Sequence, residues 1–381
     1  MAWFIITACL LIGYAGLIRF YYGHFKKLPQ FSAAGYEPKT FVSVIVAARN
    51  EEATLPKLIT ALNAQTYSPS LFEIIIVDDF STDNTQAVAQ TLRQAQDKLF
   101  SNTHINIIQP TVAANQSSKK RAIEAGVQQA KGPLLLITDA DCVPGENWIK
   151  TAAAFYEKKS AVFIAAPVKF LHNRSLLHLF QALDFITLQG ITAASVAAQF
   201  HSMCNGANLA YTKEMFQAVN GFAGIDHIAS GDDMLLMHKI WKQKKEGVQY
   251  LKSKDAIVAT GPAQTWAAFF AQRKRWASKT THYDDKRVFA VLLFIYFFNC
   301  WAVVLLIATF SNAHVGLLAV GFLLLKTSIE WPFVVMVARF YNNEKLMRYF
   351  FFLQPLHIFY TIAVGAISQF GSYEWKGRNV K

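Results

Sequence analysis

The chain has 381 residues, of which 53% are hydrophobic and only 16% are charged, a balance that excludes a wholly soluble protein and predicts membrane-embedded segments. Its net charge of +12 suits anionic lipid headgroups or phosphorylated substrates, and no nucleic-acid recognition motif accompanies it. The four cysteines are scattered without paired spacing, so neither a disulfide framework nor a zinc site is indicated.

Residues 1–27 are expected to form a transmembrane anchor. The run from Ala2 to Tyr22 is almost wholly apolar, with no basic region before it and no small-residue cleavage site after it, which favours a retained anchor over a signal peptide. Basic residues at its carboxyl end predict that the following domain is cytoplasmic. Residues 28–40, which include two prolines, are expected to be a linker.

From residue 41 onward, short apolar strands alternate with amphipathic helical stretches. The expected strands are 41–47, 72–79, 104–109 and 133–141. Such alternation predicts an α/β domain over residues 41–262, with a mainly parallel sheet and helices on both faces.

Two of these strands end in paired carboxylates, Asp78 with Asp79 and Asp139 with Asp141. Parallel strands deliver such pairs to one crevice, and close like charges are unfavourable unless a cation lies beside them. The pairs therefore indicate a site for Mg²⁺ or Mn²⁺, although a single Asp-x-Asp triplet is also compatible with a solvated turn. Because the sequence contains no glycine-rich phosphate loop, a nucleotide must be held by side chains and metal.

Seven ordered motifs carry a resemblance to a known family. They are ARNEE (48–52), IIIVDDFSTDNT (74–85), KKRAIEAG (119–126), TDAD (138–141), NGANLAY (205–211), SGDD (230–233) and QRKRW (272–276). In order and spacing this set resembles glycosyltransferase family 2, especially membrane-embedded members such as cellulose and hyaluronan synthases and ceramide glucosyltransferases. The resemblance implies a GT-A fold, a nucleotide-diphosphate sugar donor, a divalent metal and inversion at the anomeric carbon.

The resemblance also implies which residues bind the donor. Asp79 matches a nucleotide-binding position, with Asp78 and Arg49 beside it. Lys119 matches the basic residue that usually opens the third motif, and Lys120 is a near rival.

The metal and the catalytic base are assigned in the same way. Asp141 is expected to ligate the metal, and Asp139 to face the nucleotide or a metal-bound water. The family's acidic pair falls on Asp232 and Asp233, where Glu-Asp is the commoner form, and Asp233 is the expected base. The alternative for Asp233 is a helix N-cap, because an apolar helical stretch follows it.

Residues 263–287 are expected to form an amphipathic interface helix. Gln272, Arg275 and Trp276 share one face of it and match the QxxRW signature. A guanidinium suits pyrophosphate and an indole offers a plate for a sugar, so we expect Gln272 and Arg275 to bind the donor and Trp276 the acceptor. The alternative is an interfacial anchor without a catalytic role.

Residues 288–381 are expected to hold the remaining membrane helices and the tail. Candidate spans are Val288 to Phe310, Val315 to Ala338 and Tyr349 to Phe370, the second of which contains Lys326 and Glu330 one turn apart. With the anchor this makes four candidate spans. The basic tail suggests that the last segment does not cross, which leaves the tail cytoplasmic, with Arg378 placed to hold anionic donor or lipid.

The sequence thus predicts an integral membrane glycosyltransferase that acts on a lipid or glycan acceptor at the cytoplasmic face of a bacterial inner membrane, in contact with membrane lipids. A processive polysaccharide synthase is one alternative. The others are a transport protein with a nucleotide-binding regulatory domain and a nucleotidyl transferase, for which Asp233 and QRKRW have no evident use.

Overall fold

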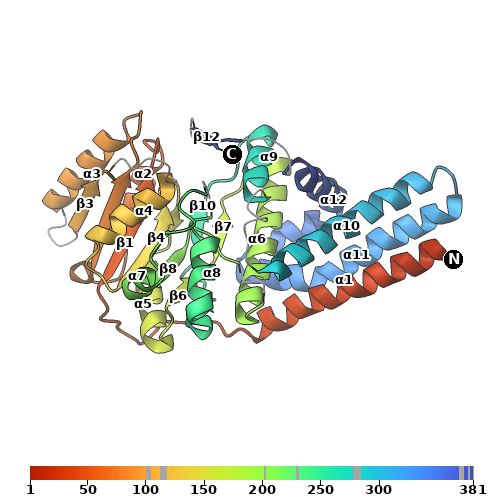
Figure 1. Cartoon of the computed structure of the whole chain (residues 1–381), viewed down its shortest axis with the longest axis horizontal. Coiled ribbons are helices and arrows are strands. Elements are labelled where there is room, and N and C mark those ends of the chain that lie inside the picture. The colour runs from red at the N-terminus through yellow and green to blue at the C-terminus, as the bar shows by residue number, and fades with distance from the viewer. Residues whose placement is uncertain are drawn as a thin grey trace. The chain divides into compact units, whose positions relative to one another are not determined.

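A computed structural model of the chain shows two compact units (Figure 1). The described residues are 1–99, 104–111, 118–200, 203–228, 231–277, 285–368, 373–375 and 378–380. The α/β unit comprises Pro29–Leu171, Ser202–Gly261 and Ser372–Lys381. The helical unit comprises Met1–Leu28, His172–His201 and Pro262–Gly371.

The α/β unit is built on a seven-stranded sheet with the order β3-β2-β1-β4-β8-β6-β9. Its strands are β1 (Val42–Ala48), β2 (Phe72–Asp78), β3 (His104–Ile108), β4 (Leu134–Asp139), β6 (Phe163–Ala165), β8 (Leu209–Thr212) and β9 (Val248–Tyr250). Strands β1 to β4 run parallel, whereas β8 runs antiparallel to β4 and β6. The apolar residues of β1, β2 and β4 are buried except for the half-buried Ala47, as expected for strands covered on both faces. The predicted mainly parallel sheet is confirmed.

Helices and a smaller sheet complete this unit. The helices are α2 (Leu55–Asn63), α3 (Thr85–Leu99), α4 (Ser118–Gln129), α5 (Trp148–Lys159), α7 (Lys213–Ala218) and α8 (Met234–Gln243), with 3₁₀ turns at Pro69–Leu71 and Lys245–Gly247. The second sheet pairs β5 (Val143–Pro144), β10 (Val258–Thr260) and β7 (Val168–Phe170). Helix α4 packs on β1 and β2 through Gly126, where a Cβ would lie only 2.5 Å from a methyl carbon of Ile45.

The strand register determines where the carboxylates emerge. Asp78 at the end of β2 lies opposite Ala48, and Asp139 at the end of β4 lies opposite Ala47. The two acids therefore flank the end of β1 at the carboxyl edge of the sheet, where α/β folds bind ligands.

The helical unit contains the membrane-span candidates. Its helices are α1 (Ala2–Lys27), α6 (Leu176–Ala197), α9 (Trp266–Ala277), α10 (Lys286–Ala308), α11 (Ala313–Phe340) and α12 (Phe350–Ile367), with a 3₁₀ helix at Glu344–Tyr349 before α12. Within the described residues, five helical segments are long and apolar enough to cross a membrane: α1, α6, α10, α11 and the segment Glu344–Ile367.

Helix α6 adds one candidate to the four that the sequence suggested. Its mean hydropathy of 1.2 is the lowest of the five, because Gln181, Asp184 and Gln189 interrupt the apolar run. The strand and helix pattern of the sequence predicts this segment as part of the α/β domain, residues 41–262. In the structure α6 packs against α1 and α11 and belongs to the helical unit.

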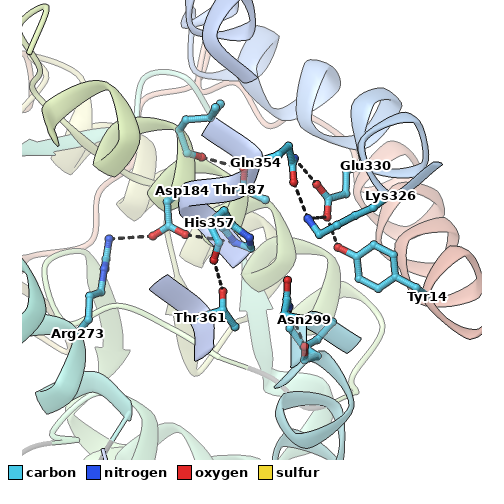
Figure 2. A network of polar contacts seen from close by, with 12 residues as sticks. Tyr14, Asp184, Thr187, Arg273, Asn299, Lys326, Glu330, Gln354, His357 and Thr361 are labelled. Atoms are coloured by element: carbon cyan, nitrogen blue, oxygen red, sulfur yellow. Dashed lines mark hydrogen bonds and ion pairs between the residues drawn. The ribbon is translucent and has the colours of Figure 1, made fainter. Parts of the chain in front are cut away.

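A closed polar cluster lies among the apolar helices of this unit (Figure 2). The Lys326 ammonium donates to Glu330 Oε1 and to Gln354 Oε1, each at 2.6 Å, so the predicted Lys326–Glu330 contact is present. Gln354 Nε2 donates to Glu330 Oε2 at 2.6 Å, and the Tyr14 hydroxyl also donates to Glu330. This cluster links α1, α11 and α12 and neutralises both charges inside an apolar bundle.

The tail forms a short hairpin of β11 (Tyr373–Trp375) and β12 (Arg378–Val380), in which Trp375 pairs with Arg378. Lys376 and Lys381 lie outside the described residues. The hairpin belongs to the α/β unit.

Candidate functional site

The first part of the site surrounds the end of β2. Asp79 is buried, and its Oδ1 lies 2.7 Å from an Arg121 guanidinium nitrogen. Arg49 Nη1 lies 4.0 Å from Asp79 Oδ2 and donates to the carbonyls of Asp79 at 2.7 Å and Phe80 at 3.1 Å. The predicted proximity of Arg49 to Asp79 is therefore present. Phe80 has a left-handed backbone with φ of 55°, a strained geometry that is frequent at functional sites.

The neighbouring Asp78 is buried as well. It accepts a hydrogen bond of 3.0 Å from the Gln109 amide and one of 3.3 Å from the backbone N–H of Ser81. These bonds fix Asp78 at the floor of the turn that follows β2.

The motif after β1 is held against the motif after β2. The Asn50 side-chain oxygen accepts from the N–H of Thr82 at 2.8 Å, and the Asn50 N–H donates to the Ser81 hydroxyl at 3.0 Å. The Glu51 N–H donates to the Thr85 hydroxyl at 2.7 Å. Two motifs that are separate in sequence therefore form one wall of the site.

The centre of the site is the ammonium of Lys119 at the start of α4. Its Nζ lies 2.8 Å from Asp139 Oδ1 and 3.1 Å from Asp232 Oδ2. Burial acts to lower the pKa of Lys119, but the carboxylates of Asp139 and Asp232 outweigh it and hold the pKa above its ordinary value. One cation thus joins the carboxylate at the end of β4 to the acidic turn before α8.

Lys120, the rival in the same motif, points elsewhere. Its side chain is fully buried and donates to the carbonyl of Ile225 and, at 2.8 Å, to that of Ile228. Consecutive residues of a helix face directions about 100° apart, so only one of the two lysines reaches the carboxylates. That residue is Lys119.

Asp139 and Asp141 offer a suitable pair of oxygen ligands. Their carboxylate oxygens and the Cys142 sulfur lie within 4.8 Å of one another. Asp141 is exposed, and its Oδ2 accepts from the Thr260 hydroxyl at 3.2 Å. Burial, followed by the charges of Asp139 and Asp141, raises the pKa of the Cys142 thiol, so the thiol stays protonated. The donor set is then two carboxylates, which fits Mg²⁺ or Mn²⁺ better than a thiolate-binding metal.

Asp233 adopts the helix-cap geometry that the sequence allowed. Its Oδ1 accepts from the N–H of Met234 at 2.7 Å, and its Oδ2 accepts from the N–H of Gly206 at 3.0 Å. A Cβ at Gly206 would lie 3.2 Å from the Lys119 ammonium and 3.3 Å from Asp232, so the glycine lets the NGANLAY loop approach the charges. Gly231, with φ of 81°, makes the turn that presents the acidic pair. Ser230 of the same motif lies outside the described residues.

The QRKRW residues belong to the helical unit. Gln272 and Arg275 are half-buried on α9, and the indole of Trp276 packs on the guanidinium of Arg273. Arg273 is itself buried and paired with Asp184 of α6 at 3.0 Å.

Sequence reasoning missed four residues of these arrangements: Arg121, Gly206, Asp184 and Arg273. Three of the four lie inside motifs that the sequence had singled out: Arg121 in KKRAIEAG, Gly206 in NGANLAY and Arg273 in QRKRW. Asp184 had only a weak signal, a lone carboxylate in an apolar helix.

The chain matches the models of two related protein families. Residues 43–218 match the family described as "Glycosyl transferase family 2", and residues 134–364 match "Glycosyl transferase family group 2".

Curated proteins also match. The chain is 24% identical to glycosyltransferase AglE of Haloferax volcanii over 194 residues, which cover 51% of this chain and 59% of that protein. It is 23% identical to the probable glycosyltransferase YdaM of Bacillus subtilis over 239 residues, which cover 62% of this chain and 54% of that protein. The chain therefore spans little more than half the length of these two relatives.

Among solved structures, the chain is similar to the mannosyltransferase PcManGT from Pyrobaculum calidifontis, solved in complex with GDP-Man and Mn²⁺. The TM-score is 0.62 at 16% identity, and the match covers 97% of this chain and 99% of that chain. At this identity the likeness shows a shared fold.

Proposed function

The chain belongs to glycosyltransferase family 2, and from that premise we propose that it transfers a sugar from a nucleotide-diphosphate donor to a lipid or lipid-linked acceptor, with inversion at the anomeric carbon. Its fold is the GT-A fold that the sequence motifs implied. The observation that carries the proposal is the contact of Lys119 with both Asp139 and Asp232, which brings the expected donor side and the expected base side into one site.

On the donor side, Asp79 and Arg49 receive the nucleotide, and Lys119 lies beside the diphosphate. Asp141 and Asp139 would hold Mg²⁺ or Mn²⁺, which would supply positive charge beside the departing diphosphate. The complex of PcManGT with GDP-Man and Mn²⁺ supports the use of a divalent metal. Lys119 contributes a second positive charge where that negative charge develops.

On the acceptor side, Asp233 takes the proton of the acceptor hydroxyl. The hydroxyl oxygen forms a bond to the anomeric carbon, and the bond from that carbon to the donor phosphate breaks with its electron pair left on the phosphate. Backbone N–H groups of Met234 and Gly206 hold the carboxylate in one orientation. The Lys119 ammonium offsets the charge of neighbouring Asp232.

We place the α/β unit on the cytoplasmic side of the membrane, because Arg19, Lys26 and Lys27 lie at the carboxyl end of α1. Both ends of α6 continue into the α/β unit, so a complete crossing by α6 would divide one folded unit between two compartments. Without α6, and with the last segment Glu344–Ile367 taken as not crossing because the basic tail follows it, α1, α10 and α11 are the crossing helices. So few crossings favour a single transfer to a lipid acceptor over processive synthesis through a channel.

The test is direct. Membranes that contain the protein are incubated with a panel of radiolabelled nucleotide sugars, with and without chelator, and organic-soluble product is separated from polymer. We expect chelator-sensitive label in the organic phase, and none with Asp233→Asn. Polymeric product would overturn the lipid acceptor, and the absence of transfer or hydrolysis with every donor would overturn the activity.

A further inference from the structure

The QRKRW helix carries a buried ion pair that the signature itself does not include. Arg273 is 2% exposed, and its Nη2 donates to Asp184 Oδ2 at 3.0 Å. Asp184 lies on α6, and its second oxygen lies 3.8 Å from His357 Nε2 on α12 (Figure 2). The pair thus anchors α9 to α6 in the interior of the helical unit.

The guanidinium of Arg273 also lies over two aromatic rings. Its central carbon is 4.2 Å from the ring centroid of Trp276 and 5.1 Å from that of Phe269. Phe185, the neighbour of Asp184 in sequence, packs on the same indole with ring centroids 5.9 Å apart. The two consecutive residues of α6 therefore act on Trp276, one directly and one through Arg273.

The ion pair is what orients the guanidinium. Arg273 Nε and Nη1 have no hydrogen-bond partner among the described residues, so the bond to Asp184 is the polar contact that sets the plane of the group. A planar guanidinium held in this way can stack on an indole, whereas a lysine ammonium offers no such plane.

We propose that Asp184 and Arg273 are positioning residues that hold the indole of Trp276 ready for the acceptor. The proposal rests on the proposed function, in which Trp276 contacts the acceptor. Removing the stack leaves the donor site of the α/β unit unchanged, so the effect falls on the Michaelis constant for the acceptor.

A purely structural role for this ion pair predicts a different pattern. Loss of one charge leaves the other buried without a partner, which destabilises a protein, whereas replacing both charges together often leaves the stability unchanged. Under a structural role, Arg273→Lys and the double replacement Asp184→Leu with Arg273→Met retain activity. Under the positioning role both impair acceptor use, although both stay folded.

The experiment measures acceptor and donor KM, kcat and thermal unfolding for these two variants in detergent. The matched control is Lys326→Met with Glu330→Leu, a buried pair of the same unit whose described contacts do not include Trp276. We expect Arg273→Lys to raise the acceptor KM by roughly 2- to 30-fold, the range of a cation–π contact, with donor KM unchanged. The control pair should leave both constants unchanged.

A second readout is independent of activity. Fluorotryptophan labelling gives fluorine NMR signals, and the Trp276 signal, identified with Trp276→Phe, should shift in Arg273→Lys and not in the control pair. An unshifted signal with an unchanged acceptor KM overturns the positioning role. If Trp276→Ala itself leaves the acceptor KM unchanged, the acceptor role of Trp276 in the proposed function fails, and this inference fails with it. A shifted signal with a raised acceptor KM supports both.

Discussion

Lys119 and Asp232 form an ion pair of 3.1 Å that joins the first turn of α4 to the acidic turn before α8. Burial disfavours the charged form of Lys119 and acts to lower its pKa. The attraction of the Asp139 and Asp232 carboxylates is stronger and raises the pKa above the ordinary value of 10.5. A raised lysine pKa means that the stabilisation is complete below pH 10.5 and is lost only as the pH rises through the higher folded-state value. The pair is therefore intact throughout the neutral range.

Replacing Lys119 by Met tests this central position. The change leaves the carboxylates of Asp139 and Asp232 facing each other, so we expect transfer to fall roughly 10²- to 10³-fold and stability by about 1–2 kcal/mol. Transfer assays and thermal unfolding measure the two effects. Lys120→Met is the control, because it removes the contacts to Ile225 and Ile228 and keeps the charge cluster. A stable Lys119→Met protein with normal transfer would contradict the assignment.

Asp233→Asn tests the catalytic base. The amide keeps the size of the side chain and one acceptor oxygen for the cap, but it loses proton affinity and the acceptor that faces the Gly206 N–H. We therefore expect transfer to fall by roughly two to four orders of magnitude while donor binding survives. Equilibrium binding of labelled nucleoside diphosphate and single-turnover transfer separate the two effects. Near-normal transfer would leave Asp233 with a structural role, in which it accepts from the N–H groups of Met234 and Gly206.

Asp141→Ala tests the metal site. Because this carboxylate would hold the cation that favours binding of the negatively charged diphosphate, we expect Mg²⁺ or Mn²⁺ to stop stimulating nucleoside diphosphate binding in the variant. Titrations with and without chelator measure the stimulation. Thr260→Val, which removes a hydroxyl that donates to Asp141, is a milder companion that should weaken the stimulation without abolishing it. Equal stimulation in wild type and Asp141→Ala would place the ion elsewhere.

Lys252 gives a prediction about pH. Its side chain is buried, and burial lowers its pKa from 10.5 to about 8. Between these values the unfolded chain binds the proton and the folded protein does not, so this residue raises stability as the pH rises from 8 to 10.5. At pH 7 the buried charge of Lys252 destabilises the folded protein, so Lys252→Met should raise the free energy of unfolding by about 1–2 kcal/mol. The difference between wild-type and variant unfolding should shrink above pH 8 and vanish near 10.5; a constant difference would contradict it.

The strands and their acidic ends could be predicted from the sequence because the pattern that specifies them is formed by neighbouring residues. An apolar run buried on both faces, followed at once by Asp78 or Asp139, determines both the strand and the edge at which the carboxylate emerges. The choice between Lys119 and Lys120 was not readable, since it depends on how α4 is rotated about its axis against the sheet.

The partners of buried charges could be predicted only where they are near in sequence. Lys326 and Glu330 are one turn apart, and their contact followed from helix geometry. Asp184 and Arg273 meet through the packing of α6 against α9, which no local pattern specifies. For the same reason α6 was counted with the α/β domain, because its composition is intermediate and its place depends on its neighbours.

The last prediction concerns the side of the tail. With the α/β unit inside the cell, as we propose from the basic residues at the end of α1, a full crossing by α12 would carry β11 and β12 outside. The hairpin belongs to the α/β unit, which favours a re-entrant or interfacial α12, whose apolar run is interrupted by Gln354 and Pro355. A cysteine at Asn379, in a protein whose native cysteines are replaced, should resist an impermeant maleimide in intact cells and react after permeabilisation. A cysteine at Asn312, between α10 and α11, is the control that should react in intact cells. Prompt labelling at position 379 in intact cells would show that α12 crosses completely.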